Sequence, residues 1–581
     1  MACLYRISAL LAMIVSCLPP QSSPLKILQI LLGYSGSHFL FNYRFAATLR
    51  DLGHNVTLLT AMGTIVPLGK IPNPPLGVVE HRISLHLDKQ FLKEGAEILE
   101  TFNFKQETPR DAMKIGSIYN TFFKQSSTQQ MENFEDLFDH LRTSTNPRQI
   151  PPKSRKKDRA KIHKKFLTRH PCPKITYFAY NTVFNLRGQN FELATGLPFG
   201  RYPVALAYKM NISRFIWISP GIFLPETTAH ILGVPTLASF MPASVGSKSS
   251  DHMTFKERFA NLFRMTVGFL FTKHKDSLYG LEKELFKAPP NDDLPDLEQL
   301  TLDMSVGVFL NGEQPLDYPL PRTLNANYLG AFGIGPAKKT KPLDPKFQRI
   351  ADDAKGMIIF SLGTVANSSA MPDNTKFALL EGLAQFPDYE IIWKFEKKDL
   401  PEAEKYKHIH LESWIPQREL LAHPKTKLFI THGGYNSLSE TTKAAIPILT
   451  VPLMADQFSN AKRAERHGVA HVIDIKDPHL TGQQVAEGIK EVLSHKRYRR
   501  NAQKLSAILK DTIVSSEKQL DFNLRRMVKR RPITNRAAAR LNTFQLYCVD
   551  VISVWVTVLL FLVYVVVKLT RRLLRKMKIV V

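Results

Sequence analysis

The sequence predicts an α/β protein with two Rossmann-like domains, followed by one transmembrane helix. Two stretches, 26–32 and 355–364, contain a short apolar run that leads into a turn with glycine and hydroxyl residues, as in the first strand of a doubly wound parallel sheet. A third stretch, 551–567, is almost wholly apolar, and together with 546–550 it is long enough to span a bilayer. The length of 581 residues accommodates two domains of ordinary size.

Residues 1–20 are predicted to form a signal peptide. Arg6 is the basic residue that precedes the apolar stretch 9–18, and two prolines end the segment. The alternative is an N-terminal core helix. The strand predicted to begin almost immediately afterwards argues against that alternative.

The first predicted domain, 25–325, opens with a β-loop-α-β unit. Strand 26–32 is followed by a glycine- and serine-rich turn, a helical run to Leu52 and a second strand over 54–60. His38 follows the first strand at its carboxyl end, where ligands bind in such sheets. An isolated loop histidine is more often structural, so its role depends on the rest of the chain.

The net charge of +27 invites an interpretation as a nucleic-acid-binding protein. The charge is local, however. There are 12 Lys and Arg against one acidic residue in 142–174, seven in 525–540 and six in 568–581, with no acidic residue in the last two segments. The remaining body is therefore close to neutral, and the predicted signal peptide and membrane helix also argue against nucleic-acid binding.

The basic segment 142–190 interrupts the first predicted domain. It is rich in Lys, Arg and Pro and has little apolar periodicity, which favours a solvated, disordered insertion. An error in the translated sequence is the alternative, because so long an unstructured insertion inside a compact domain is unusual.

The four cysteines exclude a disulfide framework in the predicted soluble part. Cys3 and Cys17 lie in the predicted signal peptide, and Cys548 lies at the membrane segment. Only Cys172 remains, so the sequence predicts neither an intrachain disulfide nor a cysteine-based metal site.

A long helix is predicted from about residue 253 to about residue 286. Its apolar residues recur at helical spacing, so we expect them to belong to the core: Phe255, Phe259, Leu262, Phe263 and Met265. Pro319, Pro321 and the stretch 330–335 then mark a linker. A second domain is predicted beyond it, over 335–520.

The most informative stretch of the chain is 414–457. It contains a short apolar run that is typical of a buried strand, the pair Gly433-Gly434, and a helical pattern from Asn436. A strand, a glycine turn and a helix N-terminus form an anion-binding site, because free N–H groups and the positive end of the helix dipole point at the ligand.

Several side chains of this stretch suit a nucleotide ligand. His432, Asn436 and Ser437 supply donors for phosphate oxygens, and Glu440 lies one helical turn beyond Asn436, where it can accept from a ribose diol. Trp414 offers a flat face on which a base can stack. Each of these residues taken alone is more often structural, and the prediction depends on their order.

This block resembles the signature of the UDP-glycosyltransferases, in particular the membrane-bound animal type that includes UDP-glucuronosyltransferases and UDP-glucosyltransferases. The resemblance covers most of the chain except the basic insertion. It implies a GT-B fold, in which 25–325 binds a lipophilic small-molecule acceptor and 335–520 binds a UDP-sugar. It implies inverting transfer of glucose or glucuronic acid to the acceptor, with UDP-sugar as co-substrate and without a cofactor or metal ion.

The resemblance also assigns roles to individual residues. His38 would be the general base that takes the acceptor's hydroxyl proton. The UDP-sugar would be bound at uracil by Trp414 and Gln417, at ribose by Glu440, at diphosphate by Thr364, His432, Gly434, Asn436 and Ser437, and at the sugar hydroxyls by Asp456 and Gln457.

Two positions depart from the pattern of the family. A carboxylate that orients the catalytic histidine would fall at Leu197, and Glu192 is on the wrong register to replace it. A glycine would precede the Ile-Pro pair where this chain has Ala445, which would strain the helix end if that site requires a positive φ. The missing acid supports an alternative function, a catalytically impaired UDP-sugar-binding homologue that acts as a partner subunit.

The predicted topology is that of a single-pass type I protein of the endoplasmic reticulum membrane. The signal peptide places the body in the lumen, residues 546–567 cross the membrane, and the basic tail 568–581 stays in the cytosol. Lys578 and Lys576 occupy the fourth and sixth positions from the end, which departs from the usual dilysine retention spacing. Association with itself or with related enzymes is compatible with the sequence, which identifies neither the acceptor nor the donor sugar.

Overall fold

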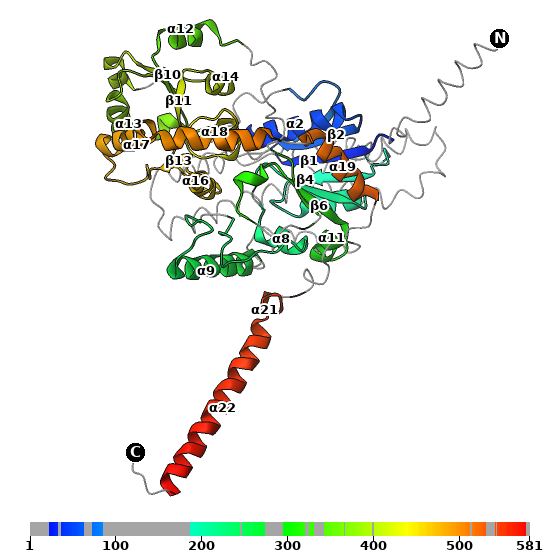
Figure 1. The fold of residues 1–581 in the computed structure, drawn as a ribbon. Coiled ribbons are helices and arrows are strands. Elements are labelled where there is room, and N and C mark those ends of the chain that lie inside the picture. Colours follow the sequence, from blue (N-terminus) through cyan, green and yellow to red (C-terminus); the bar gives the residue numbers. More distant parts are fainter. Residues whose placement is uncertain are drawn as a thin grey trace, which may run out of the picture.

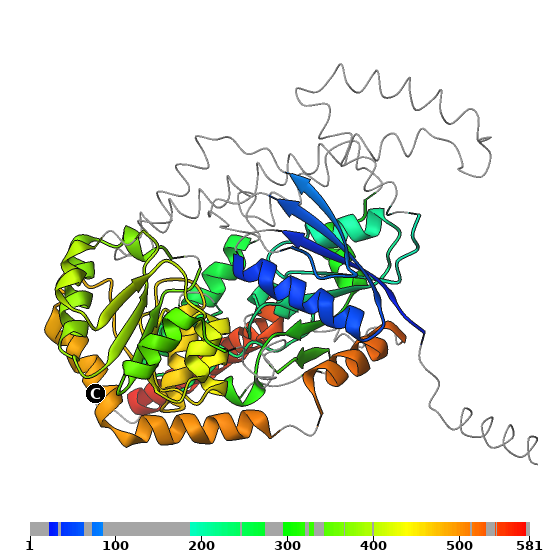
Figure 2. The same ribbon diagram turned by 90° about the horizontal axis from the view of Figure 1, so that it is seen from above.

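The computed structural model describes residues 23–32, 36–62, 73–84, 186, 188–222, 224–244, 247–272, 294–319, 323, 325–330, 342–364, 366–397, 400–511, 514–529, 541 and 543–576. The predictions for the signal peptide, for nearly all of the basic insertion and for the second half of the predicted helix 253–286 lie outside these residues. The described part contains two parallel β-sheets that lie side by side, each covered by helices, and one long helix that leaves the body (Figures 1 and 2).

The first sheet has seven parallel strands in the order β3-β2-β1-β4-β5-β6-β7. These strands are β1 (Lys26–Leu32), β2 (Asn55–Met62), β3 (Val79–Ser84), β4 (Leu193–Gly196), β5 (Phe215–Ser219), β6 (Ser305–Leu310) and β7 (Ala326–Tyr328). Along β1, Leu28 and Ile30 pack into the core on one face, and Ile27 and Leu31 pack into the core on the other. The sheet is therefore buried on both faces, which explains why β1 is a nearly continuous apolar run.

Among the residues that the structure describes, the helices between these strands are α2 (Gly36–Asp51), α7 (Tyr202–Lys209), α8 (Glu226–Ile231), α9 (Phe255–Thr272) and α11 (Leu297–Met304), with the 3₁₀ turn η1 (Gln314–Leu316). Helix α2 follows β1 directly, as predicted. Because β1 and β2 pair in parallel from Lys26–Asn55 to Leu32–Ala61, α2 is the crossover connection of the predicted β-loop-α-β unit.

The second sheet has six parallel strands in the order β10-β9-β8-β11-β12-β13. They are β8 (Met357–Ser361), β9 (Glu390–Lys394), β10 (Ile409–Glu412), β11 (Thr426–Thr431), β12 (Ile448–Thr450) and β13 (Ala470–Val472). Around them lie α12 (Pro345–Asp353), η2 (Ser368–Ala370), α13 (Asp373–Ala384), η3 (Pro401–Lys405), α14 (Gln417–Ala422), α15 (Tyr435–Lys443), α16 (Gln457–Arg466), α17 (Gly482–Ser494) and α18 (Lys496–Lys510). The predicted architecture of two Rossmann-like domains is confirmed.

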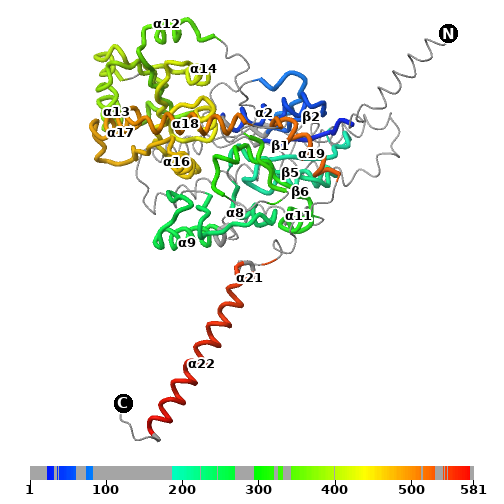
Figure 3. The backbone as a smooth tube through the Cα atoms, in the orientation of Figure 1, coloured from blue at the N-terminus to red at the C-terminus, as the bar shows by residue number. Residues whose placement is uncertain are grey.

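The chain returns to the first domain after completing the second. From α18, in orange, it passes along one side of the molecule to α19 (Ser516–Lys529), which packs on the first sheet (Figures 2 and 3). Leu520 and Leu524 of α19 are fully buried in the same core as Ile27. Residue 520 is therefore not the end of the second domain, since the helix that contains it belongs to the first core. The first sheet also extends to β7, just beyond the predicted end at residue 325.

The expectation that the apolar stripe of α9 belongs to the core is wrong. Phe255, Phe259, Leu262 and Phe263 are exposed, and the inner face of the helix contains the buried Asn261 instead. Helical periodicity identifies which residues share a face, but it does not tell whether that face points to the core or outward.

The apolar C-terminal segment forms the long helix that leaves the body. This helix, α22, spans Val549–Lys576, and its length and hydropathy are sufficient to cross a membrane. It begins three residues later than predicted, because a short helix α21 (Thr543–Leu546) precedes it and Cys548 adopts a φ of 55° that interrupts the helical path. It also continues through most of the predicted basic tail.

Ala445 occupies the backbone conformation that the sequence analysis regarded as a source of strain. It follows the C-cap of α15 with a φ of 59°, in the left-handed region. A residue with a Cβ atom adopts this region at a cost of about 1–2 kcal/mol, which a glycine would avoid. The alanine therefore stores strain at the end of the helix that follows the glycine turn.

We predict that Ala445→Gly stabilises the second domain by about 0.5–1 kcal/mol, because relief of the left-handed strain exceeds the extra chain entropy of glycine. Thermal unfolding of the detergent-solubilised protein measures this as a higher Tm. Ala444→Gly is the matched control, since Ala444 has a helical φ of −76° and its replacement should lower the Tm. Shifts of the same sign in the two variants would contradict the strain.

Candidate functional site

The carboxyl ends of the strands of the second sheet meet at one edge, and every residue predicted to bind a UDP-sugar follows one of these ends. Parallel strands bring their carboxyl ends to the same edge, where ligands bind in open α/β sheets. Thr364 follows β8, Trp414 and Gln417 follow β10, His432, Gly434, Asn436, Ser437 and Glu440 follow β11, and Asp456 and Gln457 follow β12.

The ring of His432 lies between two glycines. A Cβ atom added to Gly434 would lie 2.5 Å from Nε2 of His432, and one added to Gly363 would lie 2.5 Å from Cε1 of the same ring. Both distances are too short for any real contact, so only glycine leaves room for the ring. Gly363 and Gly433 also have φ values of 79° and 80°, which favour glycine.

His432 is neutral at physiological pH. Burial lowers the pKa of its imidazole to about 4, and the positive charge of Lys394 acts in the same direction. Lys394 is itself buried and donates to the carbonyl oxygen of Gly363 at 2.9 Å and to Glu396 at 2.6 Å. The lysine thus holds the Gly363 turn against the ring, and a neutral ring still offers one N–H donor.

Gln417 joins two other predicted residues. Its Nε2 donates to Oε2 of Glu440 at 2.8 Å and to Oγ of Ser437 at 3.3 Å. Burial raises the pKa of Glu440, while the Gln417 hydrogen bond and the charges of Arg44 and Arg418 act against the rise. Arg44 lies on α2, so a charge from the first domain acts on a residue of the second.

The side chains of Thr364, Trp414 and Asn436 have no hydrogen-bond partner among the residues that the structure describes. Thr364 and Trp414 are exposed in the loops after β8 and β10, and Trp414 is 67% exposed. Asn436 lies in the first turn of α15. Its Oδ1 is inaccessible and accepts no hydrogen bond from the residues that the structure describes. A buried acceptor in this state is costly unless a ligand or water serves it.

The start of α16 packs against the glycine turn. Oε1 of Gln457 accepts from two backbone N–H groups of 453–454 at 2.8 and 3.1 Å. Nδ2 of Asn460 donates to Oδ2 of Asp456 at 2.8 Å and to the carbonyl oxygen of Gly433 at 3.1 Å. Burial raises the pKa of Asp456, and the Asn460 hydrogen bond opposes this. The loop after β12 is thereby fixed beside the loop after β11.

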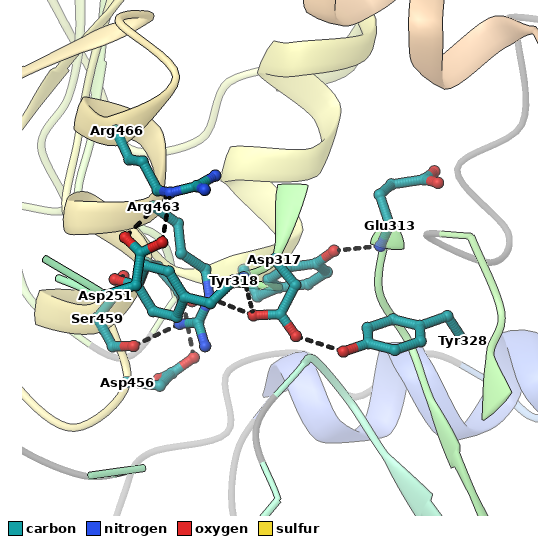
Figure 4. Close-up of polar contacts among 11 residues, drawn as sticks. Asp251, Glu313, Asp317, Tyr318, Tyr328, Asp456, Ser459, Arg463 and Arg466 are labelled. Atoms are coloured by element: carbon teal, nitrogen blue, oxygen red, sulfur yellow. Dashed lines mark hydrogen bonds and ion pairs between the residues drawn. The ribbon is translucent and has the colours of Figure 1, made fainter. Parts of the chain in front are cut away.

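Helix α16 also attaches the second domain to the first. Nε of Arg463 donates to Oδ1 of Asp317 at 2.8 Å, and both side chains are almost inaccessible (Figure 4). The guanidinium of Arg463 lies 4.5 Å from the centroid of the Tyr318 ring. At the end of the helix, Arg466 pairs with Asp251 at 2.9 Å. The residues at the start and the end of one helix therefore serve two purposes, the predicted sugar site and the domain interface.

Helix α15 supplies a second attachment. The backbone N–H of Glu313, after β6, donates to the hydroxyl of Tyr435 at 2.8 Å. The carboxylate of Glu313 pairs with Lys443 at 3.0 Å. Tyr435 directly follows the glycine turn, so the position of the first domain is coupled to the first turn of α15.

On the first domain, His38 lies in the first turn of α2 and faces an aromatic ring. The ring of Phe199 stacks on it with centroids 5.4 Å apart. Nδ2 of Asn42 donates to the backbone carbonyl of His38 at 2.8 Å, and Oδ1 of Asn42 accepts from the buried Gln29 of β1 at 2.7 Å. His38 as a whole is only partly buried, but its Nδ1 is inaccessible to solvent. Burial lowers the pKa of the His38 imidazole to about 4.

Leu197 lies in the place where the resemblance would put an orienting carboxylate. It follows β4, which pairs with β1, and it is buried in the apolar core. Glu192 does not replace it, because it precedes β4 and accepts from the backbone N–H of Lys26 at 3.0 Å. Glu192 therefore lies at the amino end of the strands, while His38 follows the carboxyl end of β1.

Several residues of this site were not predicted from the sequence. Lys394 could have been found, since it is a charged residue directly after the apolar run 391–393, and so could Asn460, which lies one helical turn beyond Asp456. Arg44 and Arg463 had no such signal, because their partners lie in the other domain. Among the residues that the structure describes, no group of three or more His, Cys, Asp and Glu is arranged to hold a metal ion.

Comparisons with known proteins support the predicted resemblance. The family model described as UDP-glucoronosyl and UDP-glucosyl transferase matches residues 116–580. "Putative UDP-glucuronosyltransferase ugt-60" of Caenorhabditis elegans is 31% identical over 535 residues, which cover 91% of this chain and 95% of the relative. UDP-glucuronosyltransferase 1A6 of Mus musculus is 28% identical over 397 residues, which cover 67% of this chain and 70% of the relative.

One solved structure supports the fold. It is a complex between a UDP-glucosyltransferase from Polygonum tinctorium capable of glucosylating indoxyl and 3,4-dichloroaniline. The superposition covers 88% of this chain and the whole of the Polygonum tinctorium chain, with a TM-score of 0.53 and 15% sequence identity. At this identity the likeness extends to the fold alone, and it confirms the predicted GT-B arrangement of two Rossmann-like domains.

The low pKa of His432 predicts a dependence of stability on pH. The unfolded chain binds a proton near the ordinary value of 6.5, whereas the folded ring binds one only near pH 4. The contribution of the neutral ring to the free energy of unfolding is thus complete above pH 6.5, and it is lost as the pH falls from 6.5 towards 4. The loss amounts to about 3 kcal/mol.

His432→Gln removes this titration. We therefore expect the Tm of the wild-type protein to fall more steeply than that of His432→Gln between pH 6.5 and pH 4, as measured by thermal unfolding in detergent. Carboxylates that titrate in the same range are common to both proteins and cancel in the comparison. Parallel curves would show that the folded ring titrates normally.

Proposed function

Because the chain belongs to the UDP-glucoronosyl and UDP-glucosyl transferase family, we propose that it transfers glucose or glucuronic acid from a UDP-sugar to a small lipophilic acceptor, with inversion at the anomeric carbon. The observation that carries this proposal is the glycine turn before α15. The N-cap Gly434 supplies no side chain to the first turn of this nine-residue helix, so its N–H groups face the turn beside the His432 ring. Free N–H groups at a helix N-terminus bind phosphate.

We assign the diphosphate to this first turn. Asn436 and Ser437 would donate to its oxygens, and the Ser437 hydroxyl is suited to this role because its Oγ already accepts from Gln417. The N–H of the neutral His432 ring and the exposed Thr364 would complete the set. The positive end of the helix dipole then stabilises the negative charge that develops on UDP as it leaves.

The nucleoside would extend from there towards α14. The carboxylate of Glu440, held by Gln417 at 2.8 Å, is a fixed acceptor for a ribose diol. Trp414 is exposed next to Gln417, so its indole face is free to stack on uracil. Asp456 and Gln457, fixed beside the glycine turn, would bind the hydroxyls of the sugar.

Catalysis would take place between the two domains. The acceptor hydroxyl attacks the anomeric carbon from the face opposite UDP, the bond from that carbon to the phosphate oxygen breaks, and UDP leaves with the electron pair. His38 takes the hydroxyl proton, for which its neutral imidazole is in the correct state at pH 7. The proposal includes no metal or cofactor, since α15 and its donors meet the charge on UDP.

A second function is favoured by Leu197. The imidazolium formed at His38 would lie in apolar surroundings beside Phe199, and burial already disfavours the charged ring. A buried leucine cannot stabilise it as a carboxylate would. A chain that binds UDP-sugar but transfers it slowly, and acts as a partner subunit of related enzymes, is the alternative function.

The location of the protein is part of the proposal. Helix α22 is long and apolar enough to anchor the chain in a bilayer. We propose that it spans the endoplasmic reticulum membrane once, with both domains in the lumen and the C-terminal tail in the cytosol. The domain of β1–β7, to which α19 returns, would bind the acceptor, and the domain of β8–β13 would bind the UDP-sugar.

UDP binding should depend on α15 and not on His38. The double variant Asn436→Ala with Ser437→Ala should lower UDP affinity by about 1–3 kcal/mol for each charged hydrogen bond lost. His38→Ala should retain the affinity of the wild-type protein, because it faces the acceptor. Isothermal titration with UDP measures both. Asn374→Ala, at an exposed asparagine of α13, is the control. Equal losses in the His38 and α15 variants would refute the assignment.

Transfer should respond to an acid at position 197. Leu197→Asp should raise the transfer rate with UDP-glucose or UDP-glucuronate, since a carboxylate that orients a catalytic histidine contributes up to about 10⁴-fold in a protease triad. We expect less here, because the leucine is packed in a core. Leu197→Asn is the matched uncharged control, and Leu197→Asp with His38→Ala should lose the gain. A gain that persists without His38, or a wild-type rate as fast as that of Leu197→Asp, would contradict the assignment.

A further inference from the structure

Helix α9 has its apolar face on the outside. Phe255, Phe259, Leu262 and Phe263 are 77, 68, 53 and 62% exposed, and Val267 is 44% exposed. At 100° per residue these five side chains fall on one side of the helix. A surface helix of a soluble domain directs such a stripe to the core, so the orientation of α9 is the reverse of the ordinary one.

The inner face of α9 explains why the helix does not rotate. Asn261 is 1% exposed and lies on the side opposite the phenylalanines. Its Oδ1 accepts from the backbone N–H of Ala243 at 2.8 Å, and its Nδ2 donates to the carbonyl oxygens of Ala238 and Met241 at 2.9 and 2.8 Å. Turning the apolar stripe inward would break the three hydrogen bonds of the buried Asn261 side chain, which fixes the stripe outward.

The loop that holds Asn261 also holds the start of the membrane helix. The hydroxyl of Tyr547, two residues before α22, donates to the carbonyl oxygen of Thr236 at 2.6 Å and lies 3.1 Å from the Thr236 hydroxyl. The loop 236–243 therefore contacts α9 on one side and the beginning of α22 on the other. In Figure 1, α9 lies across the direction of α22, along the side of the body from which α22 leaves.

From this geometry we infer that α9 is an interfacial helix, which lies on the bilayer that α22 spans and buries its apolar face among the lipid acyl chains. The charges fit this environment. Lys256, Arg258 and Arg264 are exposed on the same helix and can reach lipid phosphates, as the basic residues of interfacial helices do. The inference rests on the proposed membrane anchor, which brings α9 to the lipid surface.

A bilayer suits the exposed apolar face of α9 better than a second copy of the chain does. Helix α9, with this apolar face, lies on the side of the body from which the apolar helix α22 leaves (Figure 1), so the two apolar surfaces require the same solvent. A helix with large aromatic residues on one face and basic residues beside them matches the composition of segments that lie in the headgroup region. The experiment below distinguishes contact of this face with lipid from its cover by a second copy or by another part of this chain.

The test uses tryptophan emission from the full-length chain in phosphatidylcholine vesicles, with and without bromine on the acyl chains, which quenches fluorescence on contact. Trp555 lies in α22 and reports the anchor. Phe259→Trp is then introduced into the Trp555→Phe background, and Phe263→Trp serves as a second reporter. Phe377→Trp is the matched control, because Phe377 is a half-exposed phenylalanine on α13 of the second domain.

We expect brominated lipid to remove about half or more of the emission added by Phe259→Trp, and none of that added by Phe377→Trp. Unquenched emission at the wavelength of a water-exposed indole would overturn the inference. Unquenched but blue-shifted emission would also overturn it, since α9 would then be covered by protein. If Trp555 itself is not quenched, the anchor fails and the inference fails with it. Quenching of Trp555 without quenching at α9 refutes only the inference.

Discussion

The buried pair formed by Arg463 and Asp317 sets the relation between the two domains, and the geometry of the site depends on it. Both side chains are almost inaccessible, and removing one partner of such a pair leaves the other charge unpaired, which costs about 3–5 kcal/mol. Because Arg463 lies on the helix that begins at Asp456-Gln457, a movement of one domain against the other also moves the residues proposed to hold the sugar. The position of Asp456 and Gln457 and the alignment of the domains are thus mechanically linked.

The two halves of the site differ in completeness. On the second domain, steric fit and hydrogen bonds fix His432, Gln417 and Glu440 before any ligand arrives, which lowers the cost of binding. On the first domain, His38 is positioned through its backbone by Asn42, and the buried Leu197 stands at the position where the resemblance places an acid. This imbalance is what an evolved loss of catalysis with retained donor binding would produce, and it is also compatible with a slow enzyme.

Features that depend on local sequence were predictable. Strand β1 matches its predicted bounds of 26–32, and the φ of Ala445 follows from the glycine usually found at that position. Features that depend on distant residues were not. The sequence around Arg463 gives no indication that its partner is Asp317, which lies 146 residues away. The outward face of α9 has the same spacing as a core stripe, and only the hydrogen bonds of Asn261 decide its direction.

The return of α19 to the first sheet determines the order in which the protein can be completed during synthesis. His54 of the first domain contacts Asp521, 467 residues later, and the core around Ile27 includes Leu520 and Leu524. Contacts of such sequence separation form late, because a long loop must close first. The first domain to emerge from the ribosome is therefore the last to be finished. Until α19 arrives, immediately ahead of the membrane helix, part of its core remains open, and this is the interval in which a chaperone would be needed.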